Sequence, residues 1–91
     1  MDNDKSNYYC RVCGLFQDED IPPWGLDGHC PSFNICDCCG VEFGYGDCTF
    51  KAIMAFREAW LKKGSPWRYP EEKPDNWSLE EQLKNIPEEF K

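Results

Sequence analysis

The sequence predicts a small α+β domain that folds around one bound metal ion, and three observations lead to this prediction. A chain of 91 residues forms a small core, so it usually needs a further constraint such as a metal or disulfides. Its first half carries two Cys-x-x-Cys pairs, which together supply four thiols. Its second half contains an amphipathic helical pattern. We therefore expect a single domain over residues 1–91.

The two cysteine pairs belong to an internal repeat. The segment Tyr9–Leu15 recurs 26 residues later as Ile35–Val41, and each copy reads apolar, Cys, two residues, Cys, Gly, apolar. Short extended runs flank both copies, and glycine allows a sharp turn after each pair. We expect two metal-binding hairpins over residues 7–47, with knuckles of the zinc-ribbon or rubredoxin kind.

The loop between the hairpins is rich in Pro and Gly, and Ile21, Trp24 and Leu26 are its expected contacts with the core. A helix is predicted over residues 48–63, capped by Asp47, with Gly64 at its end. Its predicted apolar face consists of Phe50, Ile53, Met54, Trp60 and Leu61.

Residues 64–77 contain three prolines among aromatic residues, which predicts an extended segment wrapped around the body. Trp67 and Trp77 are expected to pin this segment to the helix and hairpins; a binding surface is the alternative. A short helix is predicted over residues 78–86, because Ser78 and Glu81 form a capping box. The residues after Pro87 are expected to fray.

Cys10, Cys13, Cys36 and Cys39 are the predicted metal ligands. Four thiolates satisfy a structural zinc ion completely and leave no position open for a substrate. Removing the metal should unfold the N-terminal half, because ligation and folding are coupled in small sites. Iron in the same four-cysteine site is the alternative, which would make the protein a rubredoxin-like electron carrier.

The other cysteines and the single histidine are not predicted ligands. Cys38 lies inside the second knuckle. If it replaced Cys36 as a ligand, the second copy would no longer match the first, so we expect that Cys38 does not bind the metal. Cys30, Cys48 and His29 have no spacing that favours a second metal site, and His29 is expected at the surface. Disulfides are disfavoured by the odd cysteine count and by the predicted cytoplasmic location.

Several function classes are disfavoured. The polar, acidic N-terminus does not resemble a secretory signal, and no apolar run reaches the length of a membrane span, so we expect a cytoplasmic protein. An enzyme is not expected, because four cysteines close the metal site and the chain has one histidine.

The charge is unevenly distributed. The formal net charge is −7, and residues 1–50 account for all of it, with nine acidic residues against Lys5 and Arg11. This sign opposes binding to nucleic acid, because nucleic-acid affinity depends on cations that neutralise phosphates. A basic surface on another protein is the complementary partner. Solubility alone is the simpler explanation of the acidity.

Motifs along most of the chain also resemble a known group. The resemblance depends on residues in both halves of the chain. They are both knuckles, Pro22-Pro23, the segment Pro31–Phe33, the segment Glu42–Asp47, and a tail with Arg57, Trp60, Gly64, Trp67, Trp77 and Leu83. From Tyr8 to Pro87 the chain resembles small, uncharacterised bacterial proteins related to the cysteine-rich group named for its Cys-Pro-Cys-Cys motif. Asp37 stands where that motif has proline. The resemblance implies a bacterial source and zinc binding. Some small acidic proteins of this sort resemble immunity partners of secreted toxins.

Overall fold

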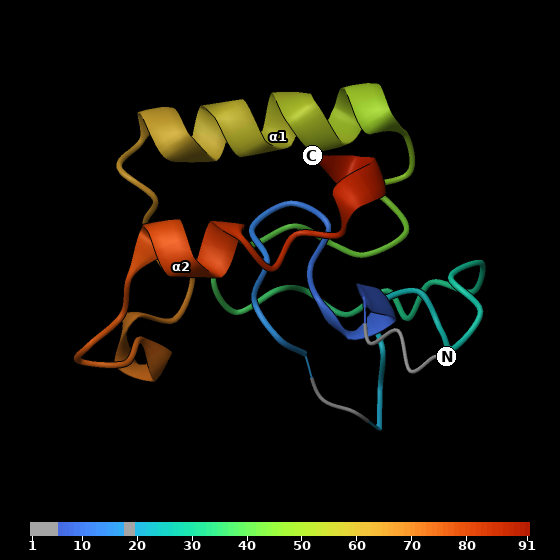
Figure 1. Ribbon diagram of the computed structural model, residues 1–91, viewed down its shortest axis with the longest axis horizontal. Helices are drawn as coiled ribbons and strands as arrows, with labels where there is room; N and C mark the ends of the chain where they lie inside the picture. The colour runs from blue at the N-terminus through green and yellow to red at the C-terminus, as the bar shows by residue number, and fades with distance from the viewer. Residues whose placement is uncertain (1–5, 18–19) are drawn as a thin grey trace.

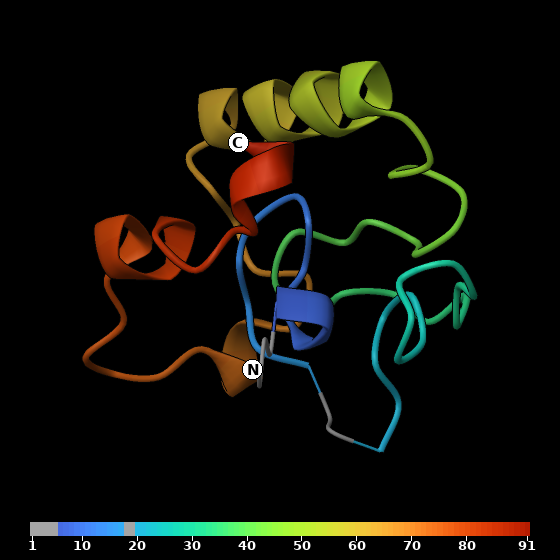
Figure 2. The ribbon, with the colours of Figure 1, turned by 45° about the vertical axis from the view of Figure 1, so that its right-hand side comes forward.

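The fold places two cysteine-bearing turns at its centre and packs the C-terminal half over them (Figure 1). The computed structural model describes residues 6–17 and 20–91. Helix α1 runs along one side of the molecule, and the second view shows the knuckles beneath it and α2 beside them (Figure 2). The elements in chain order are η1 (Ser6–Tyr8), α1 (Phe50–Lys62), η2 (Pro70–Glu72), α2 (Leu79–Leu83) and η3 (Glu88–Phe90).

The internal repeat is reproduced bond for bond in the backbone. We call Tyr9–Phe16 knuckle 1 and Ile35–Glu42 knuckle 2; each is closed by one antiparallel bridge between its end residues. Equivalent hydrogen bonds follow in both, at 2.9 Å from the first cysteine N–H and 3.0 Å from the glycine N–H. The bonds are Cys10 N–H to Leu15 O, Gly14 N–H to Cys10 O, Cys36 N–H to Val41 O and Gly40 N–H to Cys36 O.

The predicted hairpin strands are reduced to these single bridges. None of the described residues forms an extended strand, since η1 ends at Tyr8 directly before one bridge and a turn follows Glu42 directly after the other. Such short pairings cannot be stable alone, because two-stranded ribbons are marginal in water. The knuckles therefore depend on what packs against them.

Helix α1 begins two residues later than the predicted 48–63 segment, and its cap is Thr49 rather than Asp47. The Thr49 hydroxyl accepts a hydrogen bond from Ala52 N–H at 3.0 Å. Asp47 is fully buried instead, where its carboxylate accepts bonds from Trp24 Nε1 and from Gly44 N–H, both at 2.8 Å. Asp47 thus anchors the preceding turn to the interhairpin loop.

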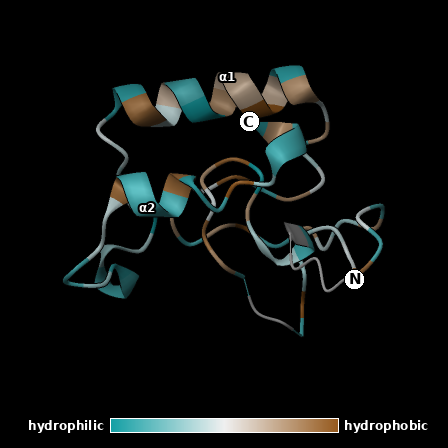
Figure 3. Ribbon diagram, in the orientation of Figure 1, coloured by the Kyte–Doolittle hydropathy of each residue, from teal (hydrophilic) through white to brown (hydrophobic). Residues whose placement is uncertain are grey.

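The buried stripe of α1 differs from the predicted apolar face. Ile53, Arg57 and Trp60 are buried, whereas Phe50, Met54 and Leu61 are between 37% and 53% exposed. The spacing of four and three residues describes a stripe one residue wide, because α1 covers the knuckles from one side only. Hydrophobic segments of the knuckles lie beneath this helix (Figure 3).

The segment 64–77 is anchored to knuckle 2 and is interrupted by η2, so it is not extended throughout. Arg68 N–H donates to Cys38 O at 2.9 Å, and Tyr69 N–H donates to Asp37 O at 3.1 Å. The Trp67 and Trp77 rings meet edge to face with centroids 5.7 Å apart, and Trp67 is buried in the core. The two tryptophans pin this segment to the body, as the sequence predicts.

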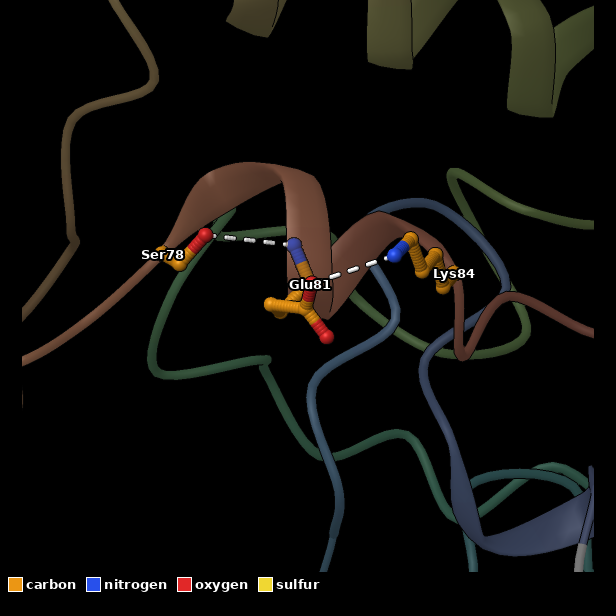
Figure 4. Close-up of polar contacts among 3 residues, drawn as sticks. All are labelled: Ser78, Glu81 and Lys84. Carbon is orange, nitrogen blue, oxygen red and sulfur yellow. Dashed lines mark hydrogen bonds and ion pairs between the residues drawn. The ribbon is translucent and has the colours of Figure 1, made fainter.

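Helix α2 starts after Ser78 but ends at Leu83, before the predicted residue 86. The Ser78 hydroxyl accepts from Glu81 N–H at 3.3 Å, and the Glu81 carboxylate contacts Lys84 Nζ at 3.1 Å (Figure 4).

The C-terminus does not show the predicted fraying. Phe90, in η3, stacks on the Arg11 guanidinium at 4.2 Å from the ring centroid, and its carbonyl accepts from Arg57. In the interhairpin loop, the Trp24 ring also packs on the Arg11 guanidinium, at 4.1 Å from the ring centroid. Ile21 and Leu26 are 48% and 74% exposed, so the expectation that they contact the core is wrong.

Candidate metal centre

Four sulfur atoms converge where the two knuckles meet. The Sγ atoms of Cys10, Cys13, Cys36 and Cys39 all lie within 4.8 Å of one another. The Cys10–Cys39 and Cys13–Cys36 sulfur pairs are both 3.7 Å apart, far beyond the bonded distance of a disulfide. A tetrahedral zinc ion with bonds of about 2.3 Å separates its sulfur ligands by about 3.8 Å. The donor set therefore fits a four-thiolate metal ion.

The close pairs reveal an approximate two-fold relation between the knuckles. Each pair joins the first cysteine of one knuckle to the second cysteine of the other. Exchanging the two copies of the repeat, 26 residues apart, converts one pair into the other. Because the backbone bonds also match, the two knuckles are equivalent turns that each contribute two cysteines to the same sulfur cluster.

The cluster belongs to the hydrophobic core. Cys10, Cys13 and Cys36 are fully buried, and Cys39 is 8% exposed at a groove beside Trp60 and Trp67. The surrounding core residues are Val12, Cys38, Val41, Phe43, Ile53, Trp60 and Trp67. Water is thus largely excluded from a centre that joins both halves of the chain.

Burial and mutual contacts set the acidity of these thiols in the metal-free protein. Burial raises the pKa of Cys13 well above its ordinary value and also raises the pKa of Cys39. Hydrogen bonds from Cys10, Cys13 and Cys39 lower the pKa of Cys36. One thiolate stabilised by neighbouring S–H groups is favourable here, whereas several uncompensated thiolates would repel one another. A divalent cation supplies the missing compensation.

Metal affinity is therefore expected to rise with pH. The thiols with raised pKa keep their protons until a metal displaces them, so protons compete with the metal as pH falls. Release of two or more protons corresponds to an affinity change of about hundredfold or more per pH unit. Competition against a chromophoric chelator between about pH 6.5 and 8 measures this slope. An affinity that is independent of pH in this range would contradict it.

Two polar side chains of the C-terminal half hold knuckle 1 in place. Arg57 is 8% exposed; its Nε donates to Val12 O at 2.7 Å, and its Nη2 donates to Arg11 O at 2.8 Å. Gln82 of α2 donates from Nε2 to Cys13 O at 3.2 Å. The knuckle's carbonyls are thereby satisfied by residues 45 to 69 positions away. Sequence reasoning assigned neither residue a role at the cysteine cluster; a charged residue within an apolar helical stripe is the signal that could have revealed the role of Arg57.

Arg57 also faces the cysteines electrostatically. Burial lowers the pKa of Arg57, and the charges of Cys10, Cys13 and Cys39 oppose this by raising it. A four-thiolate site with a divalent ion carries a net charge of about −2. The fixed guanidinium therefore favours the thiolate form of the loaded site.

Two hydrogen-bond donors lie close to the sulfur of Cys36. Gln17 Nε2 lies 3.6 Å from Cys36 Sγ, and the backbone N–H of Cys39 also donates to this sulfur. Such donors stabilise a metal-bound thiolate. The glycines after the pairs do not supply them, because the Gly14 and Gly40 N–H groups donate to cysteine carbonyls.

The remaining cysteines and the histidine stand outside the cluster. Cys38 is fully buried, and its sulfur accepts from Gln82 Nε2 at 3.4 Å. Cys30, Cys48 and His29 are exposed. Within residues 6–17 and 20–91, the four-cysteine cluster is the one group of metal-ligating side chains that is already assembled.

The two repeat glycines provide a matched test of packing against the knuckles. Both have positive φ, +85° at Gly14 and +83° at Gly40, so Ala carries a similar backbone cost of about 1–2 kcal/mol at each. A Cβ at Gly14 would lie 2.2 Å from the Gln82 carbonyl oxygen, whereas one at Gly40 meets nothing within 4 Å. Gly14→Ala should therefore lower the free energy of unfolding by about 2 kcal/mol more than Gly40→Ala, measured by denaturant titration of the metal-loaded protein. Equal losses would show that the α2 contact is absent.

No helix among the described residues is long and apolar enough to cross a membrane. No family model matches the chain, and no solved structure matches it. The chain is 30% identical to "Uncharacterized protein YoaQ" of Bacillus subtilis (strain 168) over 95 aligned positions, which cover 86% of this chain and 72% of YoaQ. This likeness is to an uncharacterised bacterial protein, as the sequence motifs imply, while the relation to the Cys-Pro-Cys-Cys group stays a prediction. With its cysteine cluster and this extent of similarity, the chain belongs to the same family as YoaQ.

Proposed function

We propose that this protein is a non-enzymatic, cytoplasmic interaction module built around a structural zinc ion. The main support for this proposal is the buried cluster of four cysteine sulfurs, two from each of the equivalent knuckles. Four thiolates complete a tetrahedral shell, and a complete shell leaves no position for water or substrate. The ion's role is then to hold the two knuckles together.

The proposed partner is another protein with a basic surface. The excess negative charge of the first 50 residues supports this, since complementary potentials favour encounter and exclude wrong partners. A narrower form of the proposal is neutralisation of a secreted bacterial toxin by an immunity-type complex. The resemblance to small acidic bacterial proteins is its support.

Metal analysis with a visible spectrum tests the structural part of the proposal. Protein purified from its native host should contain about one zinc per chain and should be colourless. Stoichiometric iron with visible thiolate-to-iron absorption would replace the proposal with a rubredoxin-like electron carrier.

Affinity capture from the native host tests the interaction part. Metal-loaded wild-type protein should retain a specific partner that the Cys39→Ser variant, which lacks a ligand, does not retain. A wild-type bait that captures nothing specific while its metal remains bound would contradict the interaction function.

A further inference from the structure

A groove of about 490 Å³ lies where the two knuckles and the segment after α1 come together. Its walls carry aromatic and aliphatic side chains from both knuckles, the loop between them and the segment after α1: Phe16, Ile21, Phe33, Ile35, Phe43 and Tyr69. Phe43 is buried at its base, while the other five are between 39% and 59% exposed. Exposed aromatic and aliphatic side chains gathered at one groove are favoured anchors for a binding partner.

The groove's walls are fixed by backbone contacts. Tyr69 is tied to knuckle 2 by the bond from its N–H to Asp37 O. Phe33 is held at φ +64°, a conformation that is rare for a bulky side chain. Its ring packs so closely on the glycine backbone at Gly44 that a Cβ there would lie 2.9 Å from Phe33 Cε1. Phe33 is therefore 59% exposed while one edge of its ring packs against Gly44.

Two acidic side chains lie at the knuckle 2 side of this groove. Asp37 lines the groove and is exposed, and Glu42 is exposed opposite Ile35 across the bridge, where cross-strand side chains share a face. Arg68 stacks over the Tyr69 ring at 5.2 Å from its centroid. Elsewhere in the described part of residues 6–50, the cation Arg11 is covered by Trp24 and Phe90. The charged side chains of knuckle 2 beside the groove are thus both carboxylates.

We propose that this groove docks a cationic segment of the partner protein that carries apolar anchor residues. The inference rests on the proposed interaction function and assigns it a surface and a partner chemistry. Apolar anchors fill the space between Phe16, Phe33 and Ile35, and flanking Lys or Arg residues pair with Asp37 and Glu42. Apolar contacts of this kind supply most of the affinity, and the charges supply the encounter rate and specificity.

A second copy of this chain does not fit the same surface. Each copy has a formal net charge of −7, and groove-to-groove contact would bring Asp37, which lines the groove, and the adjacent Glu42 toward their counterparts. Like charges brought together in this way oppose association. Sedimentation of the isolated protein should therefore give a monomer, and a dimer abolished by a groove substitution would overturn the inference.

A phage-displayed library of random dodecapeptides, selected on the zinc-loaded protein, tests the groove. Enriched peptides should carry net positive charge and at least two apolar residues. Their affinity should fall by about tenfold or more in Phe33→Asn and Ile35→Thr, because these remove apolar anchors from the groove's wall. Asn tolerates the positive φ of position 33, and Thr is β-branched like Ile, so both variants should keep the fold. Asp37→Asn with Glu42→Gln should reduce the salt dependence of binding.

Leu26→Ser and Tyr45→Ser are matched controls, because these side chains are 74% and 79% exposed and lie outside the groove. Neither should change peptide affinity. The inference is overturned if no peptides are enriched, if the enriched peptides are neutral or acidic, or if the groove variants bind them as well as the wild type.

Capture of the native partner distinguishes a failure of the groove inference from a failure of the proposed function. If a Phe33→Asn bait captures the partner as well as the wild type does, the groove is wrong and the interaction function stands. If the wild type captures no partner but selects cationic peptides in the groove, the groove stands and the proposed function is wrong.

Discussion

Removal of the metal by a strong chelator is expected to unfold the whole chain, and not the N-terminal half alone. The cysteine cluster, Ile53 and Trp60 of α1, and Trp67 of the following segment form one hydrophobic core. Structural zinc contributes about 10–16 kcal/mol of apparent binding free energy, which matches or exceeds the total stability of about 5–15 kcal/mol of ordinary domains. Far-ultraviolet circular dichroism should lose the α1 signal together with the change in tryptophan fluorescence. Zinc should restore both.

Neighbouring cysteines provide the control for this prediction. Cys39→Ser removes a proposed ligand and should leave the chain unfolded at zinc concentrations that saturate the wild type. Cys38→Ser changes an equally buried thiol outside the cluster and keeps an acceptor for Gln82, so it should cost about 1–2 kcal/mol. Equal damage from the two substitutions, or a metal-free wild type that keeps its helix, would show that the assigned ligands are wrong.

The sequence predicted the two cysteine-bearing turns, though not how short their pairing is, because the information for these turns is local. The repeat fixes four cysteines and two glycines, and the backbone bonds that close each turn span at most nine residues. Convergence of the four sulfurs also followed from the pattern, because a structural metal needs four donors. The structure added what a repeat cannot state, namely that the knuckles are related by an approximate two-fold exchange.

The packing of the second half on the knuckles could not be predicted, because it depends on contacts between distant residues. The helical spacing of apolar residues placed Phe50 and Leu61 on the buried face, yet a helix lying on one side of two small turns buries only a narrow stripe. Arg57 belongs to that stripe because carbonyls of knuckle 1 need donors that the knuckle does not contain. Likewise, the Asp47 carboxylate accepts hydrogen bonds from Trp24 and Gly44 instead of capping the helix.

The second large effect is expected from Arg57→Met. In the wild type the guanidinium satisfies the carbonyls of Arg11, Val12 and Phe90, the last at 2.6 Å. Methionine fills similar space but donates nothing, so one buried contact, to Val12 O, and two partly buried contacts are lost, at about 1–3 kcal/mol for a fully buried acceptor left unpaired and less for the other two. We expect the free energy of unfolding of the metal-loaded protein to fall by about 3–5 kcal/mol. Denaturant titration measures the change.

Two further substitutions separate hydrogen bonding from charge. Arg57→Lys keeps a cation near the cysteines but loses the planar fork, so it should recover only part of the stability lost in Arg57→Met. Arg68→Met makes the same chemical change at an exposed position, where the guanidinium stacks on Tyr69, and should cost about 0.5 kcal/mol. If Arg57→Lys fully restored stability, charge opposite the thiolates would be the dominant contribution. If Arg57→Met cost no more than Arg68→Met, the three carbonyls would have other donors, and α1 would not hold knuckle 1 through this side chain.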